Sequence, residues 1–435
     1  MTQLSSEREV ATAGQITLPG LDPGSRPEVA AAWPVLEKTG RLISLDAYRG
    51  FIMLVLISGA KWFGDGFGIV EVARHFQGNG MWQFLAGQFS HVEWQGCSFW
   101  DLLMPSFIFM VGVAMPYSYS SRLAKGDSPQ KIALHAVYRS VTLILLGTLG
   151  LLFLRDLVMF SWPNRISVTF DEVLPQIGFA YLFAFVLLGK NAKVQFWVAV
   201  GILVGYWVAF VLYPLPAPGF DYSSVGALEE SKRFTGFFAH WNKNTNLAAD
   251  FDRWFLNLIP RSEPFVFRKG GITTLNFIPT IATMIFGMIT GEFLRSSRLT
   301  IEKLKGLLIA GSLFLLGGIL LDKTLCPIVK ALWTPSWVVY SSGWALLMLA
   351  AFFWLVEVKS YRRGVFPLVV VGMNPIAMYC MAHLLDDWIF RVWKKLLGYA
   401  FFAGLYGPML RSLIVVFSLW LVSLVMYRRR IFIRI

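Results

Sequence analysis

His91 and Asp101 are the residues of this chain whose types and spacing best suit chemistry. They lie in the stretch QFSHVEWQGCSFWDLLMPSFIFMVGVAM, Gln88 to Met115, where a polar segment leads directly into an apolar one. An imidazole titrates near neutral pH and can act as a general base or a transient nucleophile. A carboxylate nearby can orient or polarise the imidazole, and when buried it needs a hydrogen-bonding or cationic neighbour. The alternative interpretation is an interfacial histidine that caps a helix.

The residues around this pair suggest a polar pocket. Gly96 permits a tight turn before the helix, and Asp101, Pro105 and Phe109 share one helical face at steps of four. Pro105 frees a carbonyl near Asp101 inside the bundle. Candidate substrate-binding residues are Glu93 and Trp94, which follow His91, and His383, which ends a later apolar segment.

Two further groups could hold a cofactor. In RLISLDAYRG, Arg41 to Gly50, Asp46 and Arg49 are three apart and can pair along a helix, and Arg139 lies similarly deep in another apolar segment. Guanidinium groups bind phosphates bidentately, although arginines here also fit membrane anchors. In VVGMNPIAMY, Asn374 precedes a proline within an apolar run, which indicates either a structural kink or a ligand contact.

Composition identifies an integral membrane protein. Of 435 residues, 56% are hydrophobic and only 15% charged, against roughly 25% charged in soluble chains. The net charge of +13 sits in short loops between apolar segments, which is the pattern of membrane topology rather than of nucleic-acid binding. Cys97, Cys326 and Cys380 form no metal-binding motif, so no metal is expected. A disulfide between Cys97 and Cys326 is conceivable, but we expect unpaired cysteines.

The apolar segments predict an all-α, polytopic bundle of about ten transmembrane helices. They span 45–63, 99–120, 131–154, 172–189, 193–213, 271–294, 303–321, 336–356, 365–384 and 406–427. Residues 1–40 are expected to be a disordered cytoplasmic tail, and residues 41–435 a single transmembrane domain. The distribution of Lys and Arg puts both termini in the cytoplasm, so that His91 and the long connections 64–98 and 214–270 face outward. Glycine pairs such as Gly287 and Gly291 indicate close helix packing.

Several motifs together resemble one family. R-L-x-S-L-D-A-x-R-G in the first helix is followed by H-x-x-W-x-G-x-x-x-x-D-L-x-x-P-x-F-x-F-x-x-G from His91 to Gly112. Further matches are V-L-x-x-I-G from Val173, W-T-P-S-W from Trp333, G-M-N-P-I from Gly372, and the closing Y-R-R-R-I-F-I-R-I. The pattern is similar to heparan-alpha-glucosaminide N-acetyltransferase and its bacterial relatives, within the transmembrane acyltransferase superfamily. It departs from the lysosomal enzyme at Ser58-Gly59-Ala60, where that enzyme has an asparagine.

The resemblance implies a membrane acetyltransferase that uses acetyl-CoA as co-substrate. Acetyl-CoA would bind from the cytoplasm at Arg49, Asp46, Arg139 and Asn374, and His91, supported by Asp101, would pass acetyl to an amino-sugar acceptor on the outer side. The implied partners are acetyl-CoA, an amino sugar or glycan, the lipid bilayer and a second copy in a homodimer. The expected location is a bacterial inner membrane, and the lysosomal membrane is the alternative. A transporter of a sugar or lipid-linked glycan is the alternative from another class, and a non-catalytic subunit of an envelope-polysaccharide assembly is a third.

Overall fold

The computed structural model describes residues 42–59, 65–150, 168–261 and 263–433. By its internal contacts the chain separates into two units, Met1–Ile43 and Ser44–Ile435, and the description below concerns the second, together with Ile43. The predicted tail, 1–40, lies outside the described residues. Within the described ranges the second unit is helical, and its extended pairing is one isolated antiparallel bridge between Gln95 and Val329.

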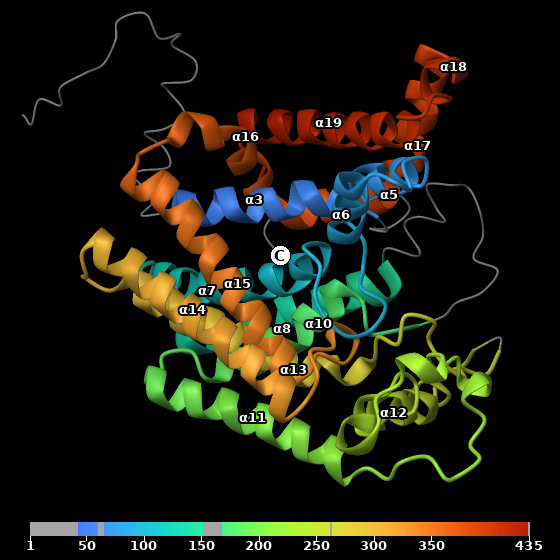
Figure 1. Ribbon diagram of the computed structural model, residues 1–435. Coiled ribbons are helices and arrows are strands. Elements are labelled where there is room, and N and C mark those ends of the chain that lie inside the picture. Colours follow the sequence, from blue (N-terminus) through green and yellow to red (C-terminus); the bar gives the residue numbers. More distant parts are fainter. Residues whose placement is uncertain (1–41, 60–64, 151–167, 262, 434–435) are drawn as a thin grey trace, which may run out of the picture. The chain divides into compact units, whose positions relative to one another are not determined.

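Each of the ten predicted apolar segments contains a helix (Figure 1). In chain order these helices are α3 (Ile43–Ile57), α7 (Leu103–Ala124), α8 (Pro129–Leu145), α10 (Val173–Val186), α11 (Ala192–Leu212), α13 (Phe277–Arg295), α14 (Thr300–Thr324), α15 (Pro335–Phe353), the pair α16 (Arg362–Gly372) and α17 (Pro375–Leu397), and α19 (Gly407–Arg428). Short 3-10 turns precede α7 (η2, Trp100–Leu102) and α13 (η7, Thr274–Asn276), and π-helical turns follow α8 (η3, Leu146–Gly150) and α15 (η9, Trp354–Val358). The all-α, polytopic prediction is therefore confirmed.

The number of full membrane spans is lower than ten within the described chain. Seven helices are long and apolar enough to cross a bilayer, or eight if α16 and α17 count as one span. These two helices meet at 64° next to Asn374, so the predicted segment 365–384 is bent rather than straight. A proline after the break lacks the N–H that would continue the helix, which confirms the kink interpretation. The described part of α3 has 15 residues and α10 has 14, short of a full span.

Helices α7 and α13 form the centre of the bundle. In the most hydrophobic 18-residue stretch of each span, 67% of the residues of α7 and 72% of those of α13 are buried. The share is only 22–28% in α8, α11, α14 and α19, which therefore lie at the periphery. Their close approach depends on glycine, as the sequence predicted. A Cβ at Gly287 or Gly291 of α13 would collide with the carbonyl oxygens of Phe109 and Val113 on α7. Such small residues let two helical backbones touch inside a membrane.

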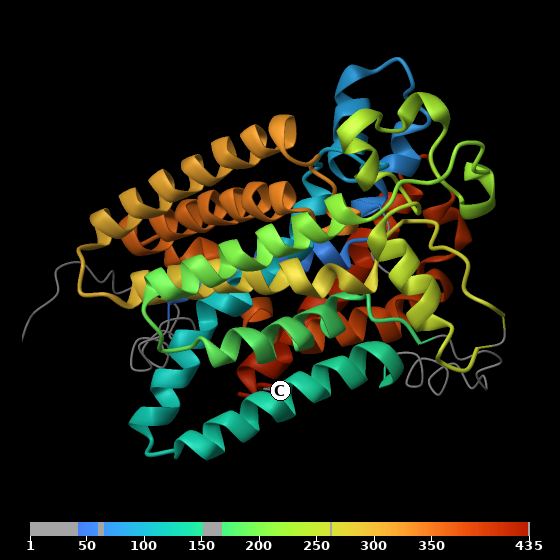
Figure 2. The same ribbon diagram turned by 90° about the horizontal axis from the view of Figure 1, so that it is seen from below.

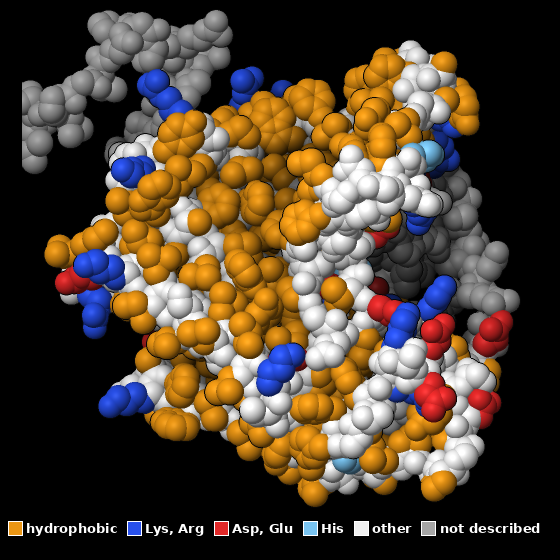
Figure 3. Space-filling model, in the orientation of Figure 1, with side chains coloured by type: hydrophobic (Ala, Val, Ile, Leu, Met, Phe, Trp, Pro, Cys, Tyr) orange, Lys and Arg blue, Asp and Glu red, His pale blue; other side chains and the backbone are white. Residues whose placement is uncertain are grey.

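The remaining helices pack in pairs around this centre. Helix α14 runs along α15, where Gly318 faces Tyr340, and α8 runs along α10 (Figure 1). The face made by α14, α15, α16 and α19 is covered with hydrophobic side chains, and charged residues lie mainly at its margins (Figure 3). A surface of this kind matches contact with lipid hydrocarbon rather than water.

Two long connections, which we call the cap, gather at one end of the long helices (Figure 2). The first carries η1 (Gly66–Gly68), α5 (Ile69–Ala73) and α6 (Gly80–Gln88). The second carries η4 (Tyr222–Val225), η5 (Glu230–Lys232), η6 (Gly236–Trp241) and α12 (Leu247–Leu256). A third connection, between α14 and α15, holds the 3-10 turn η8 (Lys330–Leu332), and α18 (Tyr399–Phe402) joins α17 to α19. The expectation that residues 214–270 exceed a simple turn is therefore correct.

Candidate functional site

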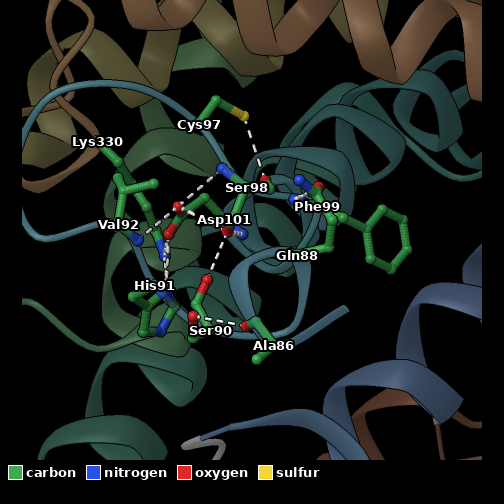
Figure 4. Close-up of polar contacts among 10 residues, drawn as sticks. All are labelled: Ala86, Gln88, Ser90, His91, Val92, Cys97, Ser98, Phe99, Asp101 and Lys330. Carbon is green, nitrogen blue, oxygen red and sulfur yellow. Dashed lines mark hydrogen bonds and ion pairs between the residues drawn. The ribbon is translucent and has the colours of Figure 1, made fainter. Parts of the chain in front are cut away.

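His91 and Asp101 are in direct contact, as their spacing suggested. The imidazole Nδ1 lies 2.6 Å from Asp101 Oδ1 (Figure 4). The imidazole is half exposed, with 50% of its side chain accessible, whereas the aspartate side chain is only 1% accessible. Nδ1 faces the carboxylate, and Nε2 has no hydrogen-bond partner among the described residues. This is the arrangement in which a carboxylate orients one imidazole nitrogen and leaves the other available for chemistry.

The Asp101 carboxylate is surrounded by donors. Oδ2 accepts hydrogen bonds from Val92 N, Ser98 N and Ser98 Oγ at 3.2, 3.2 and 2.9 Å. Oδ1 accepts from the imidazole and from the Lys330 ammonium, whose Nζ is 3.0 Å away. Two carboxylate oxygens offer about four lone-pair sites, so the partners fill the acceptor capacity of the group. The carboxylate is thereby fixed in place, and the buried anion has the compensation that the sequence argument required.

The segment that carries His91 is a closed loop between α6 and α7. Asn79 caps α6 by accepting from the Met81 and Trp82 amides, and Gln88 Oε1 accepts from Phe99 N at 3.1 Å, across the base of the loop. Gly96, at φ 109°, makes the turn that the sequence predicted. Helix α7 begins at Leu103, so Pro105 lies in its first turn, where a missing N–H costs no helical hydrogen bond. Pro105 therefore belongs to the start of α7, just after the 3-10 turn that carries Asp101.

Lys330 is the residue that the sequence argument missed. The sequence predicts that a buried Asp101 needs a cationic neighbour but does not identify it. Its Nζ lies 3.0 Å from both Asp101 Oδ1 and His91 Nδ1, across a sequence separation of 239 residues from the histidine. The Lys330 side chain is 14% accessible. Its location three residues before the W-T-P-S-W stretch was the one signal that pointed to it.

Trp94 and Glu93, two of the three predicted substrate contacts, bind residues of the second long connection. The Trp94 indole is buried, and its Nε1 donates to Trp241 O at 3.0 Å. It packs in a cluster with Tyr206, Phe210 and Trp241. The exposed Glu93 carboxylate pairs with Lys232 at 2.8 Å, and that hydrogen bond lowers the pKa of Glu93. Both side chains therefore join the two parts of the cap beside His91.

The predicted cofactor residues Asp46, Arg49 and Asn374 lie in one region. Arg49 Nη1 pairs with Asp46 Oδ1 at 3.1 Å, as predicted. A Cβ at Gly372, two residues before Asn374, would collide with the Asp46 carbonyl oxygen, so α3 and α16 are in backbone contact there.

The Asn374 side-chain amide holds the closing segment of the chain. It donates to Ile431 O at 3.0 Å and accepts from Ile433 N at 2.9 Å. The side chain is fully buried. The G-M-N-P-I and closing Y-R-R-R-I-F-I-R-I motifs are therefore joined by hydrogen bonds.

Arg139 and His383 make contacts within their own helix pairs. The Arg139 guanidinium lies 4.7 Å from the centroid of the Tyr181 ring on α10, a cation–π arrangement. His383 Nδ1 lies 3.1 Å from the Tyr379 carbonyl one turn earlier on α17, and the two rings are 4.4 Å apart.

Two more groups near His91 bear on its chemistry. Asp65 precedes Gly66, whose N donates to Phe89 O, and its carboxylate is close enough to interact electrostatically with His91. Burial, followed by the charge of Glu71, raises the pKa of Asp65. Burial and the Asp101 charge raise the pKa of the Cys97 thiol to about 12. The three cysteines are unpaired, as expected, so Cys97 and Cys326 do not form a disulfide in this structure.

Comparison with known proteins gives one group of relatives. No model of a known protein family matches the chain. It is 24% identical over 443 residues to human heparan-alpha-glucosaminide N-acetyltransferase, which covers 92% of this chain and 61% of the human protein. The mouse protein of the same name is 24% identical over 434 residues, covering 91% of this chain and 61% of its own length. The chain is a distant relative of these two acetyltransferases.

The similarity to the acetyltransferases extends over nearly the whole chain, whereas the chain spans only 61% of the length of these curated relatives. The motifs that resemble the family have structural counterparts here. The His91-to-Gly112 motif contains the His91–Asp101 pair and the Gly112 contact with Met284 O. In the W-T-P-S-W motif, Thr334 Oγ1 accepts from Val329 N at 3.1 Å and so holds the turn that carries Lys330.

Proposed function

We propose that this protein is a membrane acetyltransferase that moves an acetyl group from acetyl-CoA to an amine acceptor at His91. The observation that carries the proposal is the 2.6 Å contact between His91 Nδ1 and Asp101 Oδ1, with the imidazole half exposed. The similarity to the N-acetyltransferases over nine tenths of the chain agrees with it.

His91 Nε2 is the reacting atom in this proposal. With its proton on Nδ1, the imidazole offers a lone pair at Nε2 that can take a proton from the acceptor amine. The same lone pair can instead attack the thioester carbonyl, so that acetyl is carried on the imidazole before it reaches the amine. In both routes Asp101 touches neither substrate, and it acts as a positioning residue that holds the ring.

The proposed path of the cofactor runs along α3. Asp46 and Arg49 lie near the start of this helix, and its last residues turn back toward the cap, where Phe67 N donates to Ser58 O at 3.2 Å. From Arg49, the seventh residue of α3, to the end of the helix at Ile57 is about 12 Å. Phosphates held near Arg49 and Arg139, on the cytoplasmic side, would leave the acyl arm directed toward His91 on the outer side. An acetyl group would then cross the bilayer while the nucleotide stays behind.

The acceptor is proposed to be an amino sugar or a glycan with a terminal amine, because both relatives are named for a glucosaminide acceptor. The multi-pass helices support a location in a membrane, and we assign it to a bacterial inner membrane.

The test is acetyl transfer by purified protein in detergent, using labelled acetyl-CoA and a panel of amino sugars. We expect labelled N-acetyl product from the wild type, and a loss of at least about a hundredfold in His91→Ala. Thermal unfolding should show that the variant is folded and that CoA still stabilises it. Full activity in His91→Ala would overturn the assignment of His91. No product from any amine, together with no stabilisation by saturating CoA, would overturn the acetyltransferase proposal.

A further inference from the structure

Lys330 has a role in the proposed reaction beyond neutralising a buried charge. We propose that Lys330 shares the Asp101 carboxylate with His91, so that Asp101 orients the imidazole without giving it a full counter-ion. The ring then keeps an unprotonated Nε2 for acetyl transfer. This inference rests on the function proposed above, and it assigns Lys330 as a positioning residue.

The geometry that supports this role is a triangle of three atoms. His91 Nδ1 and Lys330 Nζ both approach the same oxygen, Asp101 Oδ1, at 2.6 and 3.0 Å, and are themselves 3.0 Å apart (Figure 4). An ammonium has only donors, and Nδ1 must carry its proton to bond to the carboxylate. The two nitrogens are therefore donors to the same oxygen.

The backbone around Lys330 fixes this position. Val329 pairs with Gln95 in the antiparallel bridge, and Gly96 N donates to Ile328 O at 3.0 Å, so the strand-like segment before Lys330 runs against the His91 loop. On the other side, Asn276 Nδ2 donates to Ala331 O at 2.9 Å and Tyr206 OH donates to Leu332 O at 3.0 Å. Anchors from both directions hold the ammonium at the carboxylate, so the contact is not that of a freely moving surface lysine.

The charges at the site show why a shared carboxylate matters. A doubly protonated His91 would place a second cation about 3 Å from the Lys330 ammonium, with only one carboxylate between them. Asp65 is the other anion that interacts with the imidazole, and its own charge is opposed by burial and by Glu71. Glu93 is paired with Lys232. Lys330 therefore opposes the addition of a proton to Nε2, whereas Asp101 favours it.

This arrangement differs from a serine-protease triad, in which the aspartate serves the histidine and stabilises the imidazolium that forms. A histidine that must attack a thioester or accept a proton from an amine needs its lone pair at neutral pH. A shared carboxylate keeps the orienting hydrogen bond and reduces the stabilisation of the imidazolium.

The test measures the protonation of His91 directly, without substrate. Diethyl pyrocarbonate modifies only unprotonated imidazole, and mass spectrometry of the His91 peptide gives its rate as a function of pH. The variants are Lys330→Met, Lys330→Arg and a matched control, Lys323→Met, which removes an exposed lysine that pairs with Asp322 nearby. We expect Lys330→Met to move the half-maximal pH of modification upward by about one unit, because Asp101 then serves the imidazole alone. Lys330→Arg and Lys323→Met should keep the wild-type midpoint.

Lys330→Met removes a cation that compensates the buried Asp101 carboxylate, and the variant could therefore fail to fold. A second variant keeps the test possible in that case. Asp101→Asn combined with Lys330→Met removes both charges and should return the midpoint to near that of the wild type. Identical midpoints in Lys330→Met and Lys323→Met would overturn the role of Lys330. If Lys330→Met does not fold, the Asp101→Asn, Lys330→Met double variant takes its place. A midpoint in that variant about one unit above that of the wild type would also overturn the role of Lys330.

The outcome is separable from that of the proposed function, because the modification needs neither acetyl-CoA nor acceptor. A midpoint shift without acetyl transfer in the wild type would reject the acetyltransferase proposal and retain the charge sharing. Acetyl transfer by the wild type without any midpoint shift in Lys330→Met would reject the charge sharing and retain the acetyltransferase proposal.

Discussion

Asp46 and Gly372 are in backbone contact: the Asp46 carbonyl oxygen occupies the space that a Cβ on Gly372 would need. The same is true in the other direction, where a Cβ at Gly50 would meet the carbonyl oxygen of Leu368. Helix α3 therefore crosses α16 at the minimum distance, immediately before the bend at Asn374. The contact joins two motifs that lie more than three hundred residues apart in the sequence.

Gly372→Ala should destabilise the protein, because the added methyl group must displace the backbone of α3. The expected loss is about 1–3 kcal/mol, the usual cost of overpacking. Thermal unfolding in detergent measures it. Gly205→Ala is the matched control, since a Cβ at Gly205 in α11 meets nothing within 4 Å. An alanine there should be neutral or slightly stabilising through helix propensity. Equal melting temperatures for the two variants would contradict this account of the contact.

Replacing Trp94 should affect stability more than substrate affinity. Trp94→Ala removes a buried indole from the cluster with Trp241 and should cost about 3–5 kcal/mol. Trp94→Phe keeps most of the packing but leaves the Trp241 carbonyl without its donor, at about 1–3 kcal/mol. Trp197→Ala, at an exposed tryptophan of α11, is the control and should change little. If Trp94→Phe instead raised KM for the acceptor at unchanged melting temperature, Trp94 would be a substrate contact after all.

Asp252 should make stability fall as the pH rises. Burial raises the pKa of this carboxyl to about 6, from 3.8 for an unperturbed aspartate, although both oxygens accept from Thr274 N. The folded state therefore holds the proton more tightly than the unfolded state between about pH 4 and pH 6, and stability decreases through that window.

Asp252→Asn keeps an acceptor for Thr274 N and removes the titration. We expect it to be more stable than the wild type at pH 7.5, by at most about 3 kcal/mol, with the advantage gone near pH 4. Melting temperatures across this range provide the measurement. Glu230→Gln, at a carboxylate with 94% of its side chain accessible, is the control. A wild-type advantage at pH 7.5 would show that the Asp252 charge is stabilising.

Cys97 should be unreactive despite its position in the His91 loop. With its pKa raised to about 12, very little thiolate exists at pH 8, and only the thiolate reacts with alkylating reagents. We expect slow labelling of Cys97 by iodoacetamide in the folded protein and rapid labelling after denaturation, followed by mass spectrometry. Cys97→Ser should retain acetyl transfer, because the serine hydroxyl can still donate to Ser98 O. Fast labelling of the native protein would make Cys97 a competing nucleophile.

The local pattern of the sequence was enough to locate the helices and the central pair. Each of the ten segments marked by hydrophobic length contains a helix, because a chain in lipid must satisfy its backbone within each helix. The ten-residue spacing of His91 and Asp101 placed them within one turn-and-helix unit, so their contact follows from nearby residues. The pairing of Asp46 with Arg49 is local in the same way.

The sequence could not decide which distant side chains complete these groups. Trp94 looked suited to a sugar, but Trp241 and the second long connection cover it. Asn374 suggested either a kink or a ligand contact; the helix bends there, and the amide binds the backbone at Ile431 and Ile433. Both outcomes depend on contacts between segments far apart in the chain, which hydrophobic periodicity does not encode.

Taken alone, the sequence determined the membrane class, the helices, and a histidine beside a carboxylate, since each follows from composition or short spacing. Only the tertiary structure decided that Lys330, 239 residues from His91, approaches the same carboxylate oxygen. The physical reason is that a buried carboxylate requires compensation, but any cation that the fold brings near can provide it. The antiparallel bridge between Gln95 and Val329 selects Lys330 for that position.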